Sequence, residues 1–340
     1  MKESSSVFEI IDETLNNSYN KLYIKEICEI AGVSRSGYYA WKNSASVRAE
    51  REEADRRDFE LILAAYKKRG YSKGAKGIYM ALLHEENPVR MNLKKIRRIM
   101  KKYGLMCPVR KANPHRRLAK KLKTDNVAGN ILNREFEDYG PRVVLLTDIT
   151  YLPYTEGFAY LSTIIDAYTK QVLSYEVSFS LEIDFVLRTV EKLIAEHGSS
   201  LKTDTIIHSD QGCHYTSHKF IELLYDRELR RSMSRKGNCW DNAPQESFYG
   251  HMKDHIKDMI KEAKSFDDVR EIVNDYIDYY NNERYQWELA KLSPNEFYRF
   301  CTTGIYPIDI PNRPEVPEIK KSSYELSKRI EEFQKNILNT

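Results

Sequence analysis

The sequence predicts an α/β protein in which a mixed sheet is flanked by helices and is preceded by all-α modules. Up to about residue 110, apolar residues recur at helical spacing among charged ones. From about residue 138, short β-rich runs begin instead, and a helical segment over 181–198 separates the third run from the fourth. Further helical segments follow from residue 217 onward. Strands that are joined and followed by helices indicate a mixed sheet with helical layers.

The first module, residues 1–48, contains the stretch IKEICEIAGVSRSGYYAWK. Its apolar residues predict a short helix, Gly32 interrupts the pattern, and Ser34 can cap a second helix. A helix, a glycine turn and a second helix form a helix-turn-helix, whose second helix can enter the major groove of DNA. We expect Arg35 and Tyr38 on that helix to contact DNA. The alternative is a small helical hairpin without a ligand.

A basic region spans the second helical module, residues 49–110, and the linker that follows, residues 111–137. Between residues 87 and 124 there are 14 Lys or Arg residues and no Asp or Glu, although the net charge of the whole chain is only +4. Such a block favours a polyanion, or it is an ordinary solvated helix face. The second module also resembles a helix-turn-helix, and the predicted DNA contacts in this region are Lys94, Arg97, Arg116 and Arg117.

Three acidic residues stand out in the β-rich domain, residues 138–300. Two apolar runs, VVLLTD and TIIHSD, end at Asp148 and Asp210. If the two strands are neighbours, both carboxylates project from one edge of the sheet. The third acid is Glu246, on the opening turn of a helix that Asn242 can cap.

Three converging carboxylates without a His or Cys cluster predict a site for two Mg²⁺ or Mn²⁺ ions. Two such ions can stabilise both the attacking and the leaving oxygen of a phosphoryl transfer. Each aspartate could instead be an ordinary residue at the end of a strand. Asp166 also follows an apolar run, and we expect it to have a structural role.

Several further residues have predicted supporting or DNA-binding roles. Lys253 and Lys257 share a helical stripe about 60° wide with Glu246 and would face DNA. Asn242 either holds Glu246 or only caps its helix, and His208 and His214 either orient the loop around Asp210 or touch DNA. A zinc site at His251 and His255 lacks a third ligand nearby in the sequence.

The chain resembles the transposases of bacterial insertion sequences of the IS-three family, specifically their second reading-frame product. The resemblance covers roughly residues 20–300 and rests on motifs that occur in the family's order. They are GVSRSGYYAW, ILNREFE, TDITYLPY, HSDQGCHYTS, SMSRKGNCWDNAPQESFYGHMK and YYNNERYQWELAKLSPNEF. The 35 residues between Asp210 and Glu246 match the spacing shared with retroviral integrases, and Lys253 stands where that superfamily usually carries a cation.

The resemblance implies an RNase H-like catalytic core of the DDE class, with two metal ions on Asp148, Asp210 and Glu246. It also implies nicking at transposon ends, followed by attack of the new 3′-hydroxyl on a second phosphodiester. Leu145 departs from the family, which commonly has tryptophan at that position. The family's full transposase usually carries a first-frame segment with a leucine zipper, and the start of this chain has no heptad run. The chain is therefore expected either to be one partial product or to depend on a first-frame partner protein for end recognition. On double-stranded DNA we expect a homo-oligomer.

Composition narrows the alternatives. Five scattered cysteines, no signal-peptide pattern and no long apolar stretch predict a cytoplasmic protein without a membrane anchor. The tail, residues 301–340, suggests no chemistry. Besides a strand-transfer enzyme, the sequence allows a catalytically silent DNA-binding regulator derived from a transposase. An RNA-cleaving nuclease of the same fold is disfavoured by the helix-turn-helix modules.

Overall fold

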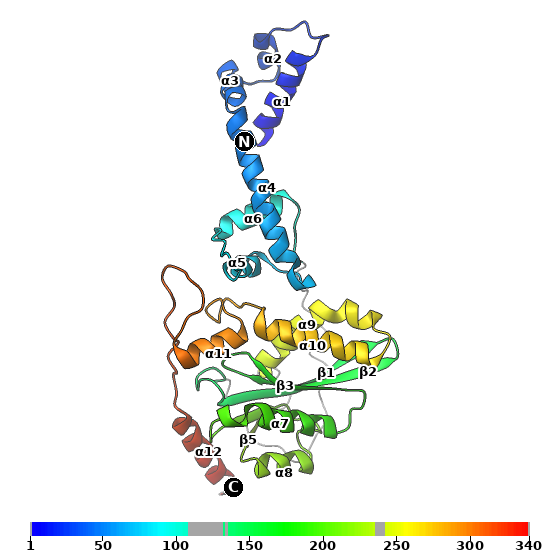
Figure 1. Ribbon diagram of the computed structural model, residues 1–340, viewed down its shortest axis with the longest axis vertical. Coiled ribbons are helices and arrows are strands. Elements are labelled where there is room, and N and C mark those ends of the chain that lie inside the picture. Colours follow the sequence, from blue (N-terminus) through cyan, green and yellow to red (C-terminus); the bar gives the residue numbers. More distant parts are fainter. Residues whose placement is uncertain (1, 108–131, 133–134, 235–241, 339–340) are drawn as a thin grey trace. The chain divides into compact units, whose positions relative to one another are not determined.

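The computed structural model describes residues 2–107, 132, 135–234 and 242–338 (Figure 1). The chain divides into two compact units, one made of residues 1–65 and 94–105 and the other of residues 66–93 and 106–340. Among the described helices, none has an apolar stretch long enough to cross a bilayer.

The first unit is helical, as the sequence predicts. Its helices are α1 (Lys2–Asn16), α2 (Ile24–Ile30), α3 (Arg35–Asn43), most of α4 (Ala45–Lys67) and α6 (Leu93–Lys102). Gly32 has a φ of +66° between α2 and α3, a conformation that favours glycine. The Ser34 side chain accepts a hydrogen bond from the Gly37 N–H at 3.1 Å, which confirms the predicted cap of α3. Helices α1 to α3 enclose a small core around Ile11 and Cys28.

The second unit contains a five-stranded sheet with the order β3-β2-β1-β4-β5. The strands are β1 (Val144–Tyr154), β2 (Gly157–Asp166), β3 (Val172–Ser178), β4 (Ile206–Ser209) and β5 (Arg230–Met233). The first three strands are antiparallel neighbours, whereas β1, β4 and β5 run parallel. This order and these directions are those of the RNase H-like fold, so the predicted fold class is confirmed.

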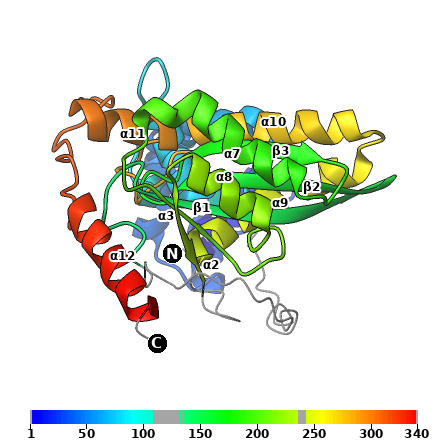
Figure 2. The same cartoon turned by 90° about the horizontal axis from the view of Figure 1, so that it is seen from below.

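Helices cover both faces of the sheet (Figures 1 and 2). They are α7 (Asp184–His197) and α8 (His218–Asp226) on one face, and α9 (Ala243–Glu262) and α10 (Phe266–Asn282) on the other. Strand residues alternate between the two cores: Leu145 packs with Phe185 on the α7 face, and Leu161 packs with Met252 on the α9 face. Leu145 is fully buried. This position, where the family commonly has tryptophan, is therefore occupied by another apolar side chain.

Residues 66–93 belong to the unit that carries the sheet. They include η1 (Lys68–Gly70) and α5 (Ala75–Leu83). Arg69 forms ion pairs with Asp275 and Glu283, both at 2.8 Å. The Tyr71 hydroxyl donates to Asp275 at 2.8 Å, and its ring is buried among α9 and α10 residues. This segment is therefore anchored to α10 by both charge and apolar packing.

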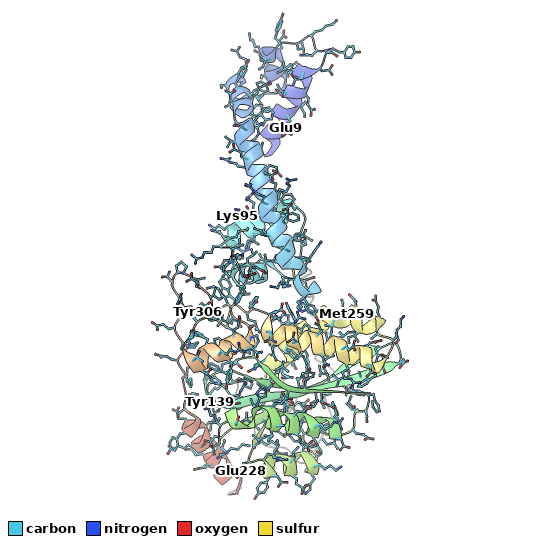
Figure 3. All side chains as sticks on the ribbon, in the orientation of Figure 1. Glu9, Lys95, Tyr139, Glu228, Met259 and Tyr306 are labelled. Carbon is cyan, nitrogen blue, oxygen red and sulfur yellow. The ribbon has the colours of Figure 1, made fainter. Side chains whose placement is uncertain are left out.

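The tail also packs on this unit. After α11 (Pro294–Thr303), the chain leads to α12 (Ser323–Leu338). Leu326 and Ile330 of α12 are buried in a cluster with Leu146 and Ile206 from the sheet. Tyr139, which lies close to α12 in Figure 3, receives a hydrogen bond from Arg329 at 3.4 Å. The part of the tail that the structure describes thus completes the core.

We expect Leu326→Ala to lower the free energy of unfolding by about 2–5 kcal/mol, because a buried leucine is replaced by a cavity. Urea unfolding of the two proteins measures this difference. The exposed Lys328 on the same helix offers a control, since Lys328→Ala should change stability by less than about 0.5 kcal/mol. Equal stability of the leucine variant and the parent would show that α12 is not docked in solution.

Candidate active site

The first two acids lie at the same level on neighbouring strands. Strands β1 and β4 are parallel, and Leu146 pairs with His208. Asp148 and Asp210 each follow two residues after that pair, so the register carries both to adjacent positions, in the middle of β1 and just past the end of β4. Adjacent strands are about 4.7–4.9 Å apart. The predicted neighbourhood of Asp148 and Asp210 therefore agrees with the sheet topology.

The third acid, Glu246, lies on the first turns of α9, which contact β1 at Asp148. The Asn242 side-chain amide lies 3.4 Å from the Thr147 carbonyl oxygen, and the Tyr249 hydroxyl donates to the Asp148 carbonyl oxygen at 2.5 Å. On a helix, Glu246 falls within about 60° of both anchoring residues. Glu246 consequently belongs to the face of α9 that is turned toward β1.

Each aspartate is fixed by a backbone N–H. Asp148 Oδ1 accepts from the Ile149 N–H, and Asp210 Oδ1 accepts from the Gly212 N–H, both at 2.8 Å. A Cβ at Gly212 would meet this Asp210 oxygen at 2.8 Å, so a larger residue here would displace the carboxylate from its present position. Within the described residues, no three His, Cys, Asp or Glu side chains form a group that could hold a metal ion as they lie.

Two buried tyrosines lie beside Asp148, one from each face of the sheet. Burial raises the pKa of the Tyr249 phenol well above its usual range, and the negative charge of Asp148 adds to this shift. Burial likewise raises the pKa of Tyr215, and the charges of Asp148 and Asp210 contribute in the same direction. Both phenols stay neutral at any working pH. Sequence patterns did not single out the Tyr249 hydroxyl.

The predicted supporting residues have structural contacts. His208 is buried, and its two ring nitrogens lie 3.0 and 3.1 Å from the hydroxyls of Ser232 and Ser234. It therefore ties β4 to β5 and does not touch DNA. His214 Nε2 lies 2.6 Å from the Leu181 carbonyl oxygen, which holds the loop after Asp210.

Asn242 precedes α9 but its side chain makes no capping hydrogen bond. Its amide nitrogen instead approaches Thr147 on β1, and its buried Oδ1 has no partner among the described residues. Of the two alternatives for Asn242, a plain cap is therefore wrong. The contact with Thr147 seats the start of the helix that carries Glu246, and the direct holding of Glu246 by Asn242 stays a prediction.

Asp166 and His255, two further residues that the sequence raised as candidate functional residues, have structural contacts. Asp166 is fully buried, forms an ion pair with Arg142 at 3.1 Å and accepts the Tyr168 N–H at 2.9 Å. This confirms its expected structural role. His255 stacks on Tyr71 at a ring distance of 5.4 Å, and burial lowers its pKa to about 4. His255 is therefore part of the aromatic core around Tyr71.

Comparison with known proteins identifies the family. Residues 138–239 and 227–294 match family models described as "Integrase core domain", and residues 53–113 match one described as "HTH-like domain". An "Uncharacterized transposase-like protein" of Haemophilus influenzae is 32% identical over 208 residues, which are 61% of this chain and 92% of that protein. The chain belongs to the IS-three family of insertion-sequence transposases.

The transposase resembles named members of this family along most of their length. It is 29% identical over 280 residues to transposase InsF for insertion sequence IS3A of Escherichia coli, covering 81% of this chain and 93% of that protein. Among solved structures, the catalytic core domain of BIV integrase matches 49% of this chain and 99% of its own, with 15% identity and a TM-score of 0.38. The match to InsF and the integrase core models confirm the family resemblance seen in the sequence motifs.

The transposase presents only some of its predicted DNA contacts to solvent. Arg35 is exposed at the start of α3, Lys257 is exposed on α9, and Lys253 is half-buried. Tyr38 is 1% exposed, and its hydroxyl donates to Asp12 at 2.5 Å. The prediction that Tyr38 contacts DNA does not hold for this position, because its ring fills the core of the first unit. Arg116 and Arg117 lie outside the described residues.

Helix α6 divides its cations between two stripes, each about 60° wide. One stripe pairs with α4: Lys95 with Asp58 at 2.5 Å, and Arg98 with Asp55 at 2.6 Å. Figure 3 labels Lys95 on this helix. The other stripe is exposed and consists of Lys94, Arg97 and Lys101. The paired stripe forms partly exposed ion pairs with α4, as an ordinary helix face does. DNA binding remains a prediction for the other stripe.

We expect Arg97→Ala to weaken DNA binding equally for all sequences and to reduce the salt slope of binding by about one, as for one lost phosphate contact. Fluorescence anisotropy with labelled duplexes at increasing salt measures the slope. Arg98→Ala is the matched control, because its side chain is committed to Asp55 and its loss should reduce stability instead. An unchanged slope for the Arg97 variant would remove this stripe from the DNA interface.

Proposed function

We propose that this transposase nicks DNA at the ends of its insertion sequence and transfers the new 3′-hydroxyl to a second phosphodiester. Asp148, Asp210 and Glu246 would be the catalytic residues. The observation that carries this proposal is the convergence of three elements: β1 and β4 bring their aspartates to one level, and α9 rests on β1 beside them.

The residues present fit a hard divalent cation such as Mg²⁺ or Mn²⁺. The donors near Asp148 are all oxygens: the carboxylates and the buried amide oxygens of Asn242 and Gln245, which have no partner among the described residues. Two ions, when bound by the three acids, would neutralise charge that develops on the reacting phosphate.

The protein's own residues would position both the acids and the DNA. The N–H groups of Ile149 and Gly212 hold the two aspartates, and the contacts of α9 with β1 direct Glu246 toward them. Lys253 and Lys257 would bind phosphates beside the acids, and the exposed stripe of α6 would bind end DNA. Such cationic contacts set affinity and register without reading bases.

Incubation of the purified transposase with labelled insertion-sequence ends and Mg²⁺ tests this function. The proposal predicts a single-strand nick at the end and, with added target DNA, a joined product, both abolished by EDTA. Specific end binding without any nick, in either Mg²⁺ or Mn²⁺, would instead support the catalytically silent regulator.

The assembly of the active complex is part of the same proposal. We expect a homo-oligomer on paired ends and a contribution to end recognition by a first-frame partner protein. We also retain the predicted organisation, with helical modules at 1–48 and 49–110 and a catalytic domain at 138–300. Light scattering with and without end DNA would show whether the number of subunits rises on binding.

A further inference from the structure

A series of hydrogen bonds runs from α9 to the backbone of β1 at the first acid. The Gln245 amide nitrogen donates to the Thr163 hydroxyl, and Thr163 Oγ1 lies 2.9 Å from the Tyr249 hydroxyl. Tyr249 in turn donates to the Asp148 carbonyl oxygen at 2.5 Å. If Thr163 donates to Tyr249, each hydroxyl in the series is both donor and acceptor, and all three side chains are buried.

The two α9 residues in this series flank Glu246. Gln245 precedes it, and Tyr249 follows it by less than one helical turn. Thr163 is the register partner of Asp148 on β2. The series therefore connects the helix that carries the third acid to the strand pair that carries the first.

Hydrogen bonds fix the position of α9 on β1 more closely than apolar packing does, because they are directional. The neighbouring contacts of α9 with the sheet are made by side chains such as Phe248 and Met252, and apolar contacts are non-directional. A helix held only by them can shift along the strand. A hydrogen bond to a strand carbonyl fixes one position, because bond strength falls steeply as its geometry worsens.

We propose that Tyr249 is a positioning residue that sets the separation of the Glu246 and Asp148 carboxylates. Its hydroxyl touches neither the substrate nor the ions, and acts through the seat of α9 on β1. This inference rests on the proposed function of the three acids. It extends that function to a residue outside the acid set.

The chain offers a matched control in Tyr276. This tyrosine of α10 is also fully buried and lies 6.3 Å from Phe248 by ring centroids. Its hydroxyl, however, has no hydrogen-bond partner among the described residues. Tyr249→Phe and Tyr276→Phe therefore remove the same atom from the same core, and only the first removes a bond to β1.

The test is Mn²⁺ binding by the full-length protein, followed by electron paramagnetic resonance, together with the Mn²⁺ dependence of end nicking. We expect Tyr249→Phe to weaken Mn²⁺ binding about tenfold or more, as for other residues that orient metal ligands. Its nicking should recover at high Mn²⁺. Tyr276→Phe should match the wild type in both assays. Identical Mn²⁺ affinity in the two variants would overturn the inference while leaving the proposed function intact.

A second variant keeps the inference testable if Tyr249→Phe fails to fold. Thr163→Val keeps the shape of the side chain but removes the hydroxyl that binds Tyr249, so it should shift Mn²⁺ affinity in the same direction by a smaller factor. Thermal unfolding of all variants separates lost affinity from lost structure. A wild type that binds no Mn²⁺ and nicks no DNA would overturn the proposed function and this inference together.

Discussion

Glu246→Gln is expected to reduce nicking of insertion-sequence ends roughly a thousandfold while end binding stays nearly unchanged. Removing one carboxylate takes away a ligand whose ion would contribute several kcal/mol of charge stabilisation in the transition state, and each 1.36 kcal/mol is about a tenfold rate change. Glutamine keeps the size of the side chain, and Glu246 lies on the first turns of α9, whereas the stripe that is proposed to bind DNA lies on another helix, α6. The substitution should therefore lower the nicking rate without lowering the affinity for end DNA.

The same outcome is expected for Asp148→Asn and Asp210→Asn, measured with labelled ends at saturating Mg²⁺. Glu262→Gln, on the last turn of α9, serves as a control for the loss of one negative charge on that helix. It should nick at the wild-type rate. Activity close to wild type in any one of the three acid variants would remove that residue from the site.

Asp166→Ala is expected to lower the free energy of unfolding by about 3–5 kcal/mol, because it leaves the charge of Arg142 buried without its partner. The Asp166 and Arg142 side chains are 0% and 3% exposed. Asp166 also accepts backbone N–H groups of the turn that follows β2, including those of Tyr168 and Thr169. The substitution therefore breaks both an ion pair and a turn.

Chemical unfolding of the parent and the variant measures this difference. The double variant Arg142→Met with Asp166→Ala should recover part of the lost stability, because no unpaired charge then remains. Asp148→Asn should cost far less, since Asp148 is only partly buried. A stability change below about 1 kcal/mol for Asp166→Ala would place that carboxylate among ordinary exposed ion pairs.

The elements that depend on local sequence patterns could be predicted from the sequence alone. Apolar runs predicted strands before Asp148 and Asp210, and β1 and β4 are strands there, although β1 continues past Asp148 to Tyr154. The cap at Ser34 and the glycine turn before it also followed from residue type alone. These predictions succeeded because backbone geometry and burial act over a few neighbouring residues.

Other features depended on contacts between distant segments. Tyr38 has the polar, aromatic character of a DNA contact, but its hydroxyl is used by Asp12 of another helix. The cations of α6 look equivalent along the sequence, yet the position of α4 commits Arg98 to Asp55. Similarly, the role of Tyr249 arises from Thr163 and Asp148, which lie more than eighty residues away along the chain.

The most direct test of the proposed active site is the position of Mn²⁺ in a crystal of the transposase, located by anomalous scattering. We expect Mn²⁺ to bind between the carboxylates of Asp148 and Asp210, with Glu246 turned toward the same ions. An anomalous peak only at another place, in a protein that still nicks DNA with Mn²⁺, would contradict it.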